Sequence, residues 1–441
     1  MYAMDKLIEM LISDFQGREL PALTPRHSRL RAMRGKASTV IGMRRSGKTW
    51  FCFQQMSGLL AAGTTRDRIL YLNFDDERLQ PMGQADLWLI PEVYYRLFPD
   101  NKKRTCHFFF DEIQNVEGWE PFVRRVLDGE DARLVLTGSS AKLLSRELAT
   151  SLRGRGLATE IFPFSFPEYV SHLGLEAGGK GFSSAIRAAM ESAFSAYLRS
   201  GGFPEVIDAD EELRRRVLQD YVDVVLFRDV VERHGVSNTT ALRHLTRHLL
   251  NALAARFSVN KFYHSLRSQG VRCGRDVLHE WLDHLVDAYL GFPVRGHSRS
   301  EAVRRVNPPK IYAVDPGLVA AMCHRAEPDR GALLENIVFL ALRRKGLVPE
   351  YCLTGSGYEV DFLVRTPKGD VRLIQACADL GDEATREREF RAAREAMDEQ
   401  GLNSATVISA FHEESVETDG RRIEVIPAWR WLLTDPLVAD H

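Results

Sequence analysis

The chain has 441 residues, of which 44% are hydrophobic and 27% are charged; this composition is typical of folded globular proteins and excludes disordered and fibrous classes. Lys and Arg number 59 against 60 Asp and Glu, so the overall charge indicates neither a nucleic-acid nor a membrane partner, and only a local patch could do so. At roughly 150 residues per domain, this length predicts about three domains.

The six cysteines are scattered, without a C-x-x-C pair, which is typical of reduced thiols in a cytosol. The N-terminal sequence MYAMDKLIEMLISDF lacks a basic leader. No run approaches the roughly 18 apolar residues that a membrane span needs. We therefore expect a cytoplasmic protein with no membrane partner.

The first third of the chain alternates short apolar runs with longer helical patterns. The runs have the length and composition of strands buried on both faces and comprise residues 38–41, 69–74, 107–110 and 133–137. Helical stretches such as WEPFVRRVLDG, residues 119–129, separate them. This alternation predicts a three-layer α/β domain with a parallel sheet.

The stretch GMRRSGKT, residues 42–49, fits the phosphate-loop pattern G-x-x-x-x-G-K-[ST] and lies between a predicted strand and a predicted helix. Such a loop wraps phosphates with backbone N–H groups and starts a helix whose dipole faces the anion. Lys48 is expected to reach the β and γ phosphates, and the Thr49 hydroxyl to bind Mg²⁺. The residues predicted to bind ATP are Gly42, Arg45, Ser46, Gly47, Lys48 and Thr49.

The apolar strand HFFF, residues 107–110, ends in Asp111 and Glu112, as a Walker B motif does. Asp111 is predicted to hold Mg²⁺, partly through water, and Glu112 to polarise the water that attacks the γ phosphate. Asn73 and the acidic residues 75–77 follow the second strand. They either orient Glu112 or are solvated.

The next strand ends in TGSS, where Ser139, together with Thr137 and Ser140, is predicted to sense the γ phosphate. The segment LRGRG then supplies Arg153 and Arg155. Either arginine could act as a finger on the nucleotide of a neighbouring subunit. The sequence therefore predicts self-association.

The middle of the chain is mostly helical. Residues 166–216, interrupted by Gly201-Gly202 and Pro204, predict a small helical lid. Three further helices, with Ser258 as the N-cap of the second, are predicted at residues 241–254, 259–268 and 276–290. An Arg-rich stretch and a strand at residues 310–314 follow, which is the order of a winged helix-turn-helix.

The last part of the chain predicts a compact α/β unit. Its expected elements are a helix at 333–344, a strand at 359–364, a turn at 366–370, a strand at 371–376, a charged helix at 384–400 and a strand at 405–410.

Motifs along nearly the whole chain resemble those of the bacterial and archaeal AAA+ ATPases, of STAND-like type, that carry a C-terminal nuclease-like domain. In order, they are GMRRSGKT, YLNFDDERL, FFFDEIQNVEGWE, LVLTGSSAKLL, LATSLRGRG, FPFSFPEY, YLRSGGFPEV, DVVERHGV, KIYAVDPGL, ENIVFLALRR and GYEVDFLV. The resemblance implies ATP binding and hydrolysis at the residues named above. It favours Arg155 as the finger, with Arg153 as the alternative.

The resemblance also implies a fold class: a P-loop AAA+ core with a helical lid, a winged-helix middle domain and a C-terminal α/β domain similar to PD-(D/E)XK nucleases, which have the restriction-endonuclease fold. The predicted domains are the ATPase core at 1–165, the lid at 166–216, the winged helix at 217–325 and the nuclease-like domain at 326–441.

A PD-(D/E)XK site needs carboxylates that bind Mg²⁺ and a lysine that steadies the attacking water. The matching positions in this chain are Glu335, Asp361 and Gln375-Ala376-Cys377. Neutral Gln375 weakens a Mg²⁺ site, which prefers charged oxygens, and Cys377 stands where the lysine should be. Another cation, such as Lys368 or Arg372, could restore a metal-dependent nuclease site. We expect instead that the nuclease fold serves binding or structure.

The stretch from Arg295 to Lys310 holds five basic residues and one acidic residue, a local net charge of +4. In a winged helix this stretch would lie along phosphates. The residues predicted to bind DNA are Arg295, Arg299, Arg304 and Arg305, and a protein partner is the alternative.

Together these patterns predict an ATP- and Mg²⁺-dependent switch or motor that engages DNA. The alternatives are a metal-dependent nuclease licensed by ATP, and a scaffold that binds protein under the control of ATP.

Overall fold

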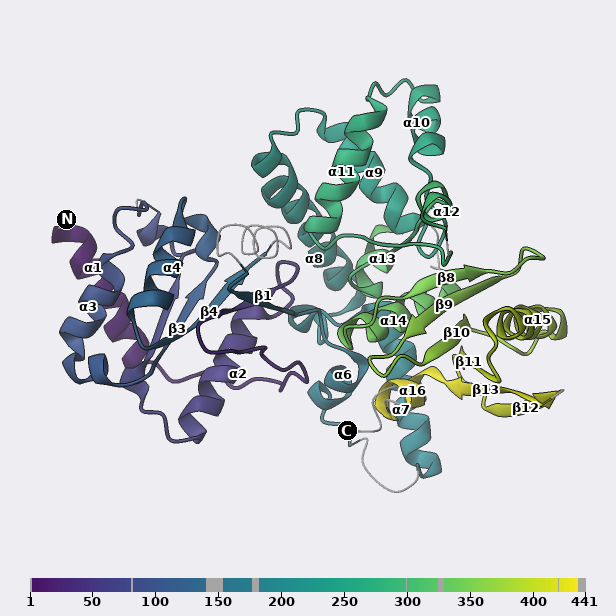
Figure 1. Ribbon diagram of the computed structural model, residues 1–441, viewed down its shortest axis with the longest axis horizontal. Helices are drawn as coiled ribbons and strands as arrows, with labels where there is room; N and C mark the ends of the chain where they lie inside the picture. Colours follow the sequence, from purple (N-terminus) through teal and green to yellow (C-terminus); the bar gives the residue numbers. More distant parts are fainter. Residues whose placement is uncertain are drawn as a thin grey trace. The chain divides into compact units, whose positions relative to one another are not determined.

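The computed structural model describes residues 2–80, 82–139, 154–176, 182–298, 300–323, 329–418 and 420–434. The chain divides into two compact units, Met1–Ile161 and Phe162–His441 (Figure 1). All three segments predicted to follow the ATPase core lie in the second unit. Within the described ranges, no helix is both long enough and apolar enough to cross a membrane.

The first unit is built on a parallel sheet, as the sequence predicts. Among the described residues, its strands lie in the order β2-β3-β4-β1-β5, and every neighbouring pair is parallel. β4 therefore separates the strand before the phosphate loop from the strand that ends in Asp111. The strands are β1 (Ala37–Ile41), β2 (Ile69–Asn73), β3 (Cys106–Asp111), β4 (Ala132–Gly138) and β5 (Gly156–Glu160).

Helices cover both faces of this sheet because successive strand residues point to opposite faces. Phe109 of β3 belongs to a core with Phe51 and Met56 of α2, whereas the next residue, Phe110, packs against Phe122 of α4, with ring centroids 5.6 Å apart. The helices of this unit are α1 (Tyr2–Gly17), α2 (Lys48–Ala61), α3 (Leu89–Leu97) and α4 (Trp119–Gly129), with short 3₁₀ turns η1 (Arg66–Arg68), η2 (Glu77–Leu79), η3 (Pro99–Lys103) and η4 (Ile113–Asn115).

The second unit begins with helices, most of them near the predicted positions. The Ser258 side chain accepts a hydrogen bond of 3.4 Å from the backbone N–H of Lys261 and caps α10, as predicted. β6 and β7 pair in antiparallel fashion after α11. The elements are α6 (Phe166–His172), α7 (Ser184–Ser200), η5 (Pro204–Val206), α8 (Glu211–Val224), η6 (Val225–Glu232), α9 (Thr239–Asn251), α10 (Val259–Ser268), α11 (Arg275–Asp287), β6 (Phe292–Val294), α12 (Glu301–Val306), β7 (Lys310–Tyr312) and α13 (Pro316–Met322).

Asp315 joins the end of α7 to the start of α13. Its buried carboxylate accepts hydrogen bonds from the backbone N–H groups of Gly202 at 2.7 Å, Gly317 at 2.7 Å and Leu318 at 3.3 Å. Gly201 has a positive φ of 70°, and a Cβ atom there would lie 1.9 Å from Asp315 Oδ1. The Gly-Gly turn is thus shaped to admit this carboxylate.

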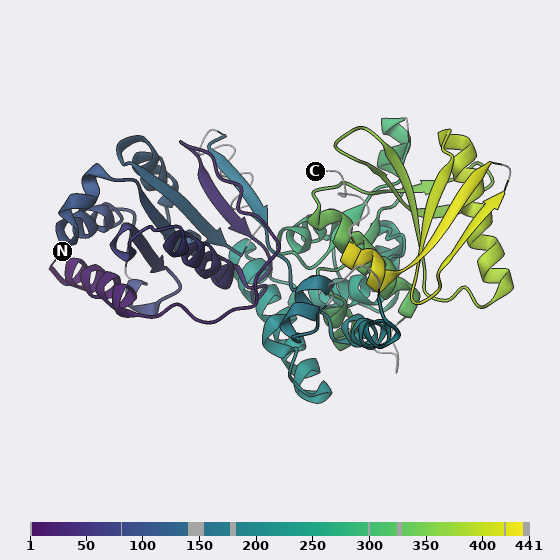
Figure 2. The same cartoon turned by 90° about the horizontal axis from the view of Figure 1, so that it is seen from below.

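The C-terminal part forms a mixed sheet, ordered β12-β13-β11-β10-β9-β8 among the described residues. Phe390 and Met397 of α15 pack with Leu363 and Val407 on one face, and α14 contacts the sheet at β10 from the other side (Figures 1 and 2). The elements are α14 (Arg330–Arg344), β8 (Glu350–Leu353), β9 (Glu359–Arg365), β10 (Val371–Cys377), α15 (Glu383–Gln400), β11 (Ser404–Ser409), β12 (Glu414–Thr418), β13 (Arg421–Pro427) and α16 (Ala428–Thr434).

Candidate nucleotide-binding and hydrolysis site

The phosphate-loop sequence connects the end of β1 to the start of α2. Gly42 has φ 153°, and a Cβ atom there would lie 2.1 Å from the carbonyl oxygen of Ile161, so this position admits only glycine. Gly47 caps α2, and the first hydrogen bond of the helix runs from Phe51 N to Gly47 O at 2.9 Å. The backbone N–H groups of residues 48–50 therefore precede the helical ladder and remain at its positive end.

The Lys48 side chain is buried between the loop and the end of β3. Its ammonium donates hydrogen bonds of 3.2 Å to the carbonyl oxygens of Gly42 and Met43 and lies 3.5 Å from Glu112 Oε1. The predicted loop lysine and the predicted catalytic carboxylate thus belong to one cluster.

Asp111 is held by three hydroxyl groups. Its Oδ2 accepts from Thr49 Oγ1 at 2.7 Å and from the Tyr71 hydroxyl at 3.0 Å, and its Oδ1 accepts from Thr137 Oγ1. Burial, together with the charge of Glu112, raises the pKa of Asp111. The structure therefore brings the two predicted Mg²⁺ ligands, Thr49 and Asp111, into direct contact.

Glu112 follows the strand in a left-handed backbone conformation, with φ 53°. Its backbone N–H donates to Thr137 Oγ1 at 2.9 Å, and its carboxylate accepts from Gln114 Nε2. Burial alone would raise the pKa of Glu112, but the Lys48 ammonium and the Gln114 hydrogen bond hold it below the usual range. The carboxylate is thus kept ionised, as acceptance of a proton from water requires.

The residues of the loop fit a phosphate group and Mg²⁺. Ser46 Oγ is buried and has no hydrogen-bond partner among the described residues, which leaves a polar atom for a ligand to satisfy. Mg²⁺ is usually bound through one or two carboxylates, phosphates and water, and Thr49 with Asp111 matches this donor set. Mg²⁺ would supply positive charge to bound phosphates.

The other predicted site residues have varied positions. Ser139 is buried directly after β4, and Arg45 is exposed in the loop with φ 66°. Arg155 lies at the surface, 44% exposed, and pairs with Asp128. Arg153 and Ser140 lie outside the described residues.

Among the described residues, the acidic segment after β2 makes no direct contact with Glu112. Asn73 Oδ1 accepts a hydrogen bond of 3.0 Å from the backbone of Asp75, and Asp76 pairs with Arg78. Asp75 Oδ1 accepts a hydrogen bond of 3.3 Å from Asn115 Nδ2, so this turn is joined to the segment that follows Glu112.

Sequence reasoning missed three residues around this site: Tyr71, Gln114 and Arg26. Arg26 is buried, and its Nη2 donates to the Ser46 carbonyl oxygen at 3.3 Å, while its own backbone pairs with the Gln54 side chain of α2. Gln114 lies two residues after Glu112, and this closeness in sequence could have indicated that it contacts the site. Tyr71 and Arg26 reach the site through strand pairing and chain folding, which leave no motif.

In the second unit, the predicted nuclease-like residues are only partly brought together. Glu335 and Asp361 both bind the Lys310 ammonium, at 2.7 Å and 2.9 Å. Gln375 is not part of this group, since its amide bonds the backbone of Asp361 and the Glu389 carboxylate. The positions expected to supply the missing cation do not do so: Lys368 is exposed in a turn, and Arg372 is 4.0 Å from Asp370.

The predicted DNA-binding stretch lies partly against β8. Tyr351 N donates a hydrogen bond of 3.1 Å to the Arg295 carbonyl oxygen. The Arg295 side chain is exposed. Arg304 bonds the Glu350 carboxylate, which His297 also contacts at 2.8 Å. Arg299 and the Arg305 side chain lie outside the described part of the chain.

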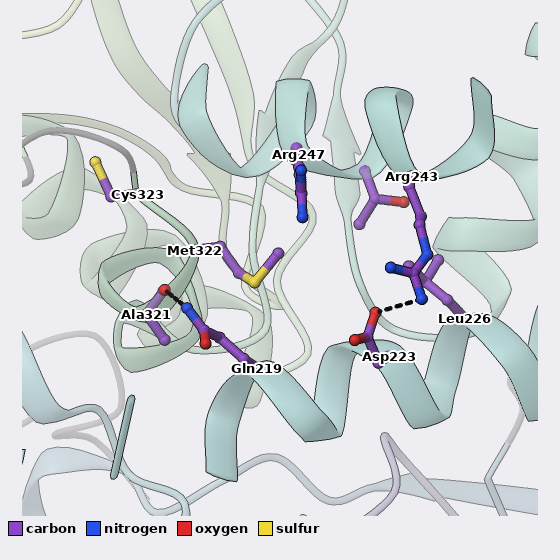
Figure 3. A pocket seen from close by; sticks show the side chains of 9 residues that line it. Gln219, Asp223, Leu226, Arg243, Arg247, Ala321, Met322 and Cys323 are labelled. Atoms are coloured by element: carbon purple, nitrogen blue, oxygen red, sulfur yellow. Dashed lines mark hydrogen bonds and ion pairs between the residues drawn. The ribbon is translucent and has the colours of Figure 1, made fainter. Parts of the chain in front are cut away.

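A small cavity of about 180 Å³ lies among α8, α9 and the end of α13 (Figure 3). Arg243 on its wall pairs with Asp223 at 3.4 Å, and Gln219 donates to the Ala321 carbonyl oxygen at 2.8 Å. Arg247, one helical turn beyond Arg243, points toward the same space (Figure 3). Asp223 thus neutralises part of the positive charge on this wall.

A family described as an AAA domain matches residues 34–170, which contain every element of the nucleotide site described above except α1 and the segment around Arg26. The uncharacterized protein MJ1544 of Methanocaldococcus jannaschii is 32% identical over 437 residues, covering 97% of this chain and 95% of the relative. The chain belongs to this AAA-domain family.

The chain is also similar to a bacterial protein. An uncharacterized protein of Haemophilus influenzae is 30% identical over 395 residues, covering 89% of this chain and 93% of its own length. A second family, described as a domain of unknown function (DUF8612), matches residues 191–329. This match begins within α7 and ends just before α14.

Among solved structures, the AAA protein is similar to the Walker-type ATPase PABY2304 of Pyrococcus abyssi, with 15% identity, a TM-score of 0.38 and coverage of 64% of this chain and 90% of that one. Cdc6p from Pyrobaculum aerophilum has 13% identity, a TM-score of 0.26 and coverage of 70% and 96%.

Proposed function

We propose that the protein binds and hydrolyses ATP and uses the cycle as a switch or motor. The observation that carries this proposal is the network in which Lys48 contacts Glu112 while Thr49 and Thr137 contact Asp111. It joins a phosphate loop, a Mg²⁺ ligand and an ionised carboxylate at the ends of β1 and β3, on either side of β4, and these are the parts that phosphoryl transfer to water needs.

In this proposal each residue has a distinct task. The loop backbone and Lys48 bind the β and γ phosphates, and Thr49 with Asp111 holds Mg²⁺. Glu112 orients water and accepts its proton. Ser139, at the end of β4, senses the γ phosphate.

We further propose that subunits associate and that Arg155 acts on a neighbouring subunit's nucleotide, with Arg153 as the alternative. Arg155 directly precedes β5, the strand beside β1, and its guanidinium is held at the surface by the exposed Asp128. A surface ion pair of this kind is weak. Arg155 can therefore leave Asp128 and bind a phosphate with little loss of free energy.

Turnover measurements with matched variants test hydrolysis. Glu112→Gln should bind ATP normally and lose turnover by more than about 100-fold, whereas Glu117→Gln, which changes an exposed carboxylate nearby, should keep wild-type turnover. Wild-type turnover in Glu112→Gln would refute the assigned base.

Mixing two inactive variants tests the arginine in trans. Glu112→Gln subunits retain Arg155, and Arg155→Ala subunits retain Glu112, so a mixed assembly contains complete sites only if the arginine crosses the interface. We expect the mixture to recover turnover and the particle mass to rise with ATP. A monomeric mass, or no recovery, would count against self-association through Arg155.

DNA is the partner that we propose for the second unit, and α10 with the loop after it supports this choice. From Arg256 to Arg275 the chain has five Lys or Arg and no Asp or Glu. Lys261, Arg267 and Arg272 are exposed, and no carboxylate of the described residues forms an ion pair with them. Such a surface suits phosphates.

Two neighbouring surfaces are less suited to DNA. The exposed side of α11 carries Asp276, Glu280 and Asp283, which would repel phosphates. Arg304, in the stretch expected to bind DNA, is neutralised by Glu350. The support for DNA binding therefore rests mainly on α10 and its following loop.

Salt-dependent binding to labelled duplex DNA tests this proposal. Replacing Lys261, Arg267 and Arg272 by Ala should reduce the slope of log affinity against log salt by about 0.9 for each phosphate that the variant no longer neutralises. Arg304→Ala should change it little. Binding that is absent or indifferent to salt would favour the alternative, a scaffold that binds protein under the control of ATP.

A further inference from the structure

Lys310, the first residue of β7, extends its ammonium group into a cluster of carboxylates. In the described part of the chain, Lys310 Nζ lies 2.7 Å from Glu335 Oε1, 2.6 Å from Glu359 Oε1 and 2.9 Å from Asp361 Oδ1. Glu335 belongs to α14, and the other two carboxylates belong to β9. The Lys310 side chain is only 4% exposed.

We propose that the Lys310 ammonium is the resident cation of this carboxylate cluster. It takes the place that a divalent metal ion has in a nuclease site, and the cluster is an ionic joint within the second unit instead of a hydrolytic centre. This inference concerns the second unit alone and does not depend on ATP hydrolysis.

The charges of the cluster favour a protonated lysine. Burial would lower the pKa of Lys310, but the charges of Asp361, Glu335 and Glu359 together raise it above the usual range of lysine. Buried carboxylates without partners would cost several kcal/mol of stability. The lysine is thus the group that makes the burial of these acids tolerable.

Further hydrogen bonds complete the cluster. Arg256 Nε donates to Glu359 Oε2 at 2.9 Å, and the buried Tyr312 hydroxyl donates to Glu335 Oε1 at 2.6 Å. Asp361 Oδ2 accepts from the backbone N–H of Ala376 at 3.0 Å. Each carboxylate therefore has a second partner besides the lysine, as a satisfied buried network requires.

The geometry suits an ammonium group. Hydrogen bonds from N⁺–H to a carboxylate are about 2.7–2.9 Å long, close to the observed distances from Lys310 Nζ. The ammonium therefore fills the point on which the three carboxylates converge.

Most of the cluster is closed to a substrate. The Glu335 and Asp361 side chains are 12% and 7% exposed, and Tyr312 is fully buried beside them. Glu359 is 27% exposed, but its two oxygens are taken by Lys310 and Arg256. Cys377, at the position where a nuclease would have its lysine, packs in the hydrophobic core with Phe390. A phosphodiester would find neither an open approach nor the expected cation.

Thermal unfolding of the full chain tests the joint. Lys310→Met should lower the unfolding midpoint by several degrees, because it leaves the buried carboxylates without their cation. Asp361→Asn should lower it less, because Lys310 keeps Glu335 and Glu359. The double variant should lose less than the sum of the two single losses. Lys261→Met, which changes an exposed lysine of α10 in the same unit, is the matched control and should leave the midpoint unchanged. Additive losses, or a wild-type midpoint in Lys310→Met, would overturn the proposal.

A metal-binding measurement tests the proposal even if Lys310→Met does not fold. Mn²⁺ bound to wild type and to Asp361→Asn is counted by electron paramagnetic resonance without nucleotide, and we expect equal numbers. We also expect no Mn²⁺-dependent cutting of labelled DNA by wild type, either with or without ATP. An extra Mn²⁺ in wild type, or cutting that Asp361→Asn abolishes, would overturn the proposal in favour of an ATP-licensed nuclease.

Discussion

The Tyr71 hydroxyl donates a hydrogen bond of 3.0 Å to Oδ2 of Asp111, the same oxygen that accepts from Thr49 at 2.7 Å. Tyr71 lies on β2, beside the strand that ends in Asp111. The position of this carboxylate is therefore set from both neighbouring strands, since Thr137 contacts its other oxygen from β4.

Removing the tyrosine hydroxyl should weaken Mg²⁺ dependence without abolishing turnover. In Tyr71→Phe, Asp111 loses one of its hydrogen bonds, and we expect the Mg²⁺ concentration for half-maximal ATPase activity to rise roughly 3- to 10-fold. Tyr94→Phe is the control, because its hydroxyl bonds the Asp67 carbonyl oxygen away from the site. An equal shift in both variants would contradict the role of Tyr71.

Thr137 should be essential for turnover because it contacts both members of the acidic pair. Thr137→Val loses the hydrogen bonds to Asp111 and to the Glu112 backbone, and we expect turnover to fall roughly 10- to 100-fold through misplacement. ATP affinity should change little, and Thr137→Ser should restore most of the turnover. Steady-state kinetics and nucleotide titration separate these effects.

Gly42 and Gly58 should respond in opposite ways to the same substitution. Gly42→Ala forces a methyl group toward the Ile161 carbonyl oxygen and should lower the free energy of unfolding by roughly 1–3 kcal/mol. Gly58→Ala, in an exposed part of α2 where nothing lies within 4 Å, should raise it by roughly 0.5–1 kcal/mol. Denaturant unfolding measures both, and equal signs would be inconsistent with the structure.

Asp315 should make stability depend on pH. Burial raises the pKa of Asp315 to about 6, although backbone N–H groups and the charge of Arg344 favour the ionised form; Tyr197 and Glu168 are the other ionisable groups nearby. The folded protein thus holds this proton more tightly than the unfolded chain does. The resulting stability is present at low pH and is lost as pH rises through about 6.

The corresponding measurement compares wild type with Asp315→Asn across pH. We expect the cost of the substitution to fall by roughly 1 kcal/mol between pH 5 and pH 7. A cost that stays constant, or grows with pH, would show that Asp315 does not bind its proton more tightly in the folded state.

The nucleotide site could be predicted because its main parts are local in the sequence. The loop, its lysine and its threonine lie within eight consecutive residues, 42–49, and Asp111-Glu112 ends an obvious apolar strand. The contribution of Tyr71 could not be predicted, since it depends on which strands are neighbours. That order follows from packing and not from spacing.

Other parts of the structure could not be predicted, either because a strand lacks the usual apolar pattern or because a contact joins residues far apart in the sequence. β5 has the sequence GLATE, and only its fourth residue is buried, so it lacks the apolar pattern of a buried strand. β12 is mostly exposed at a sheet edge. Lys310 lies 25 residues from Glu335 and 51 from Asp361, so local patterns assigned it to an exposed basic stretch, whereas the structure buries it.

The cluster around Lys310 has a mechanical consequence. Lys310, at the start of β7, is joined to α14 and β9 through buried charges, and Arg256, in the chain after α9, adds an exposed ion pair to Glu359 of β9. We therefore expect the segment before β7 and the C-terminal sheet to move together as one body.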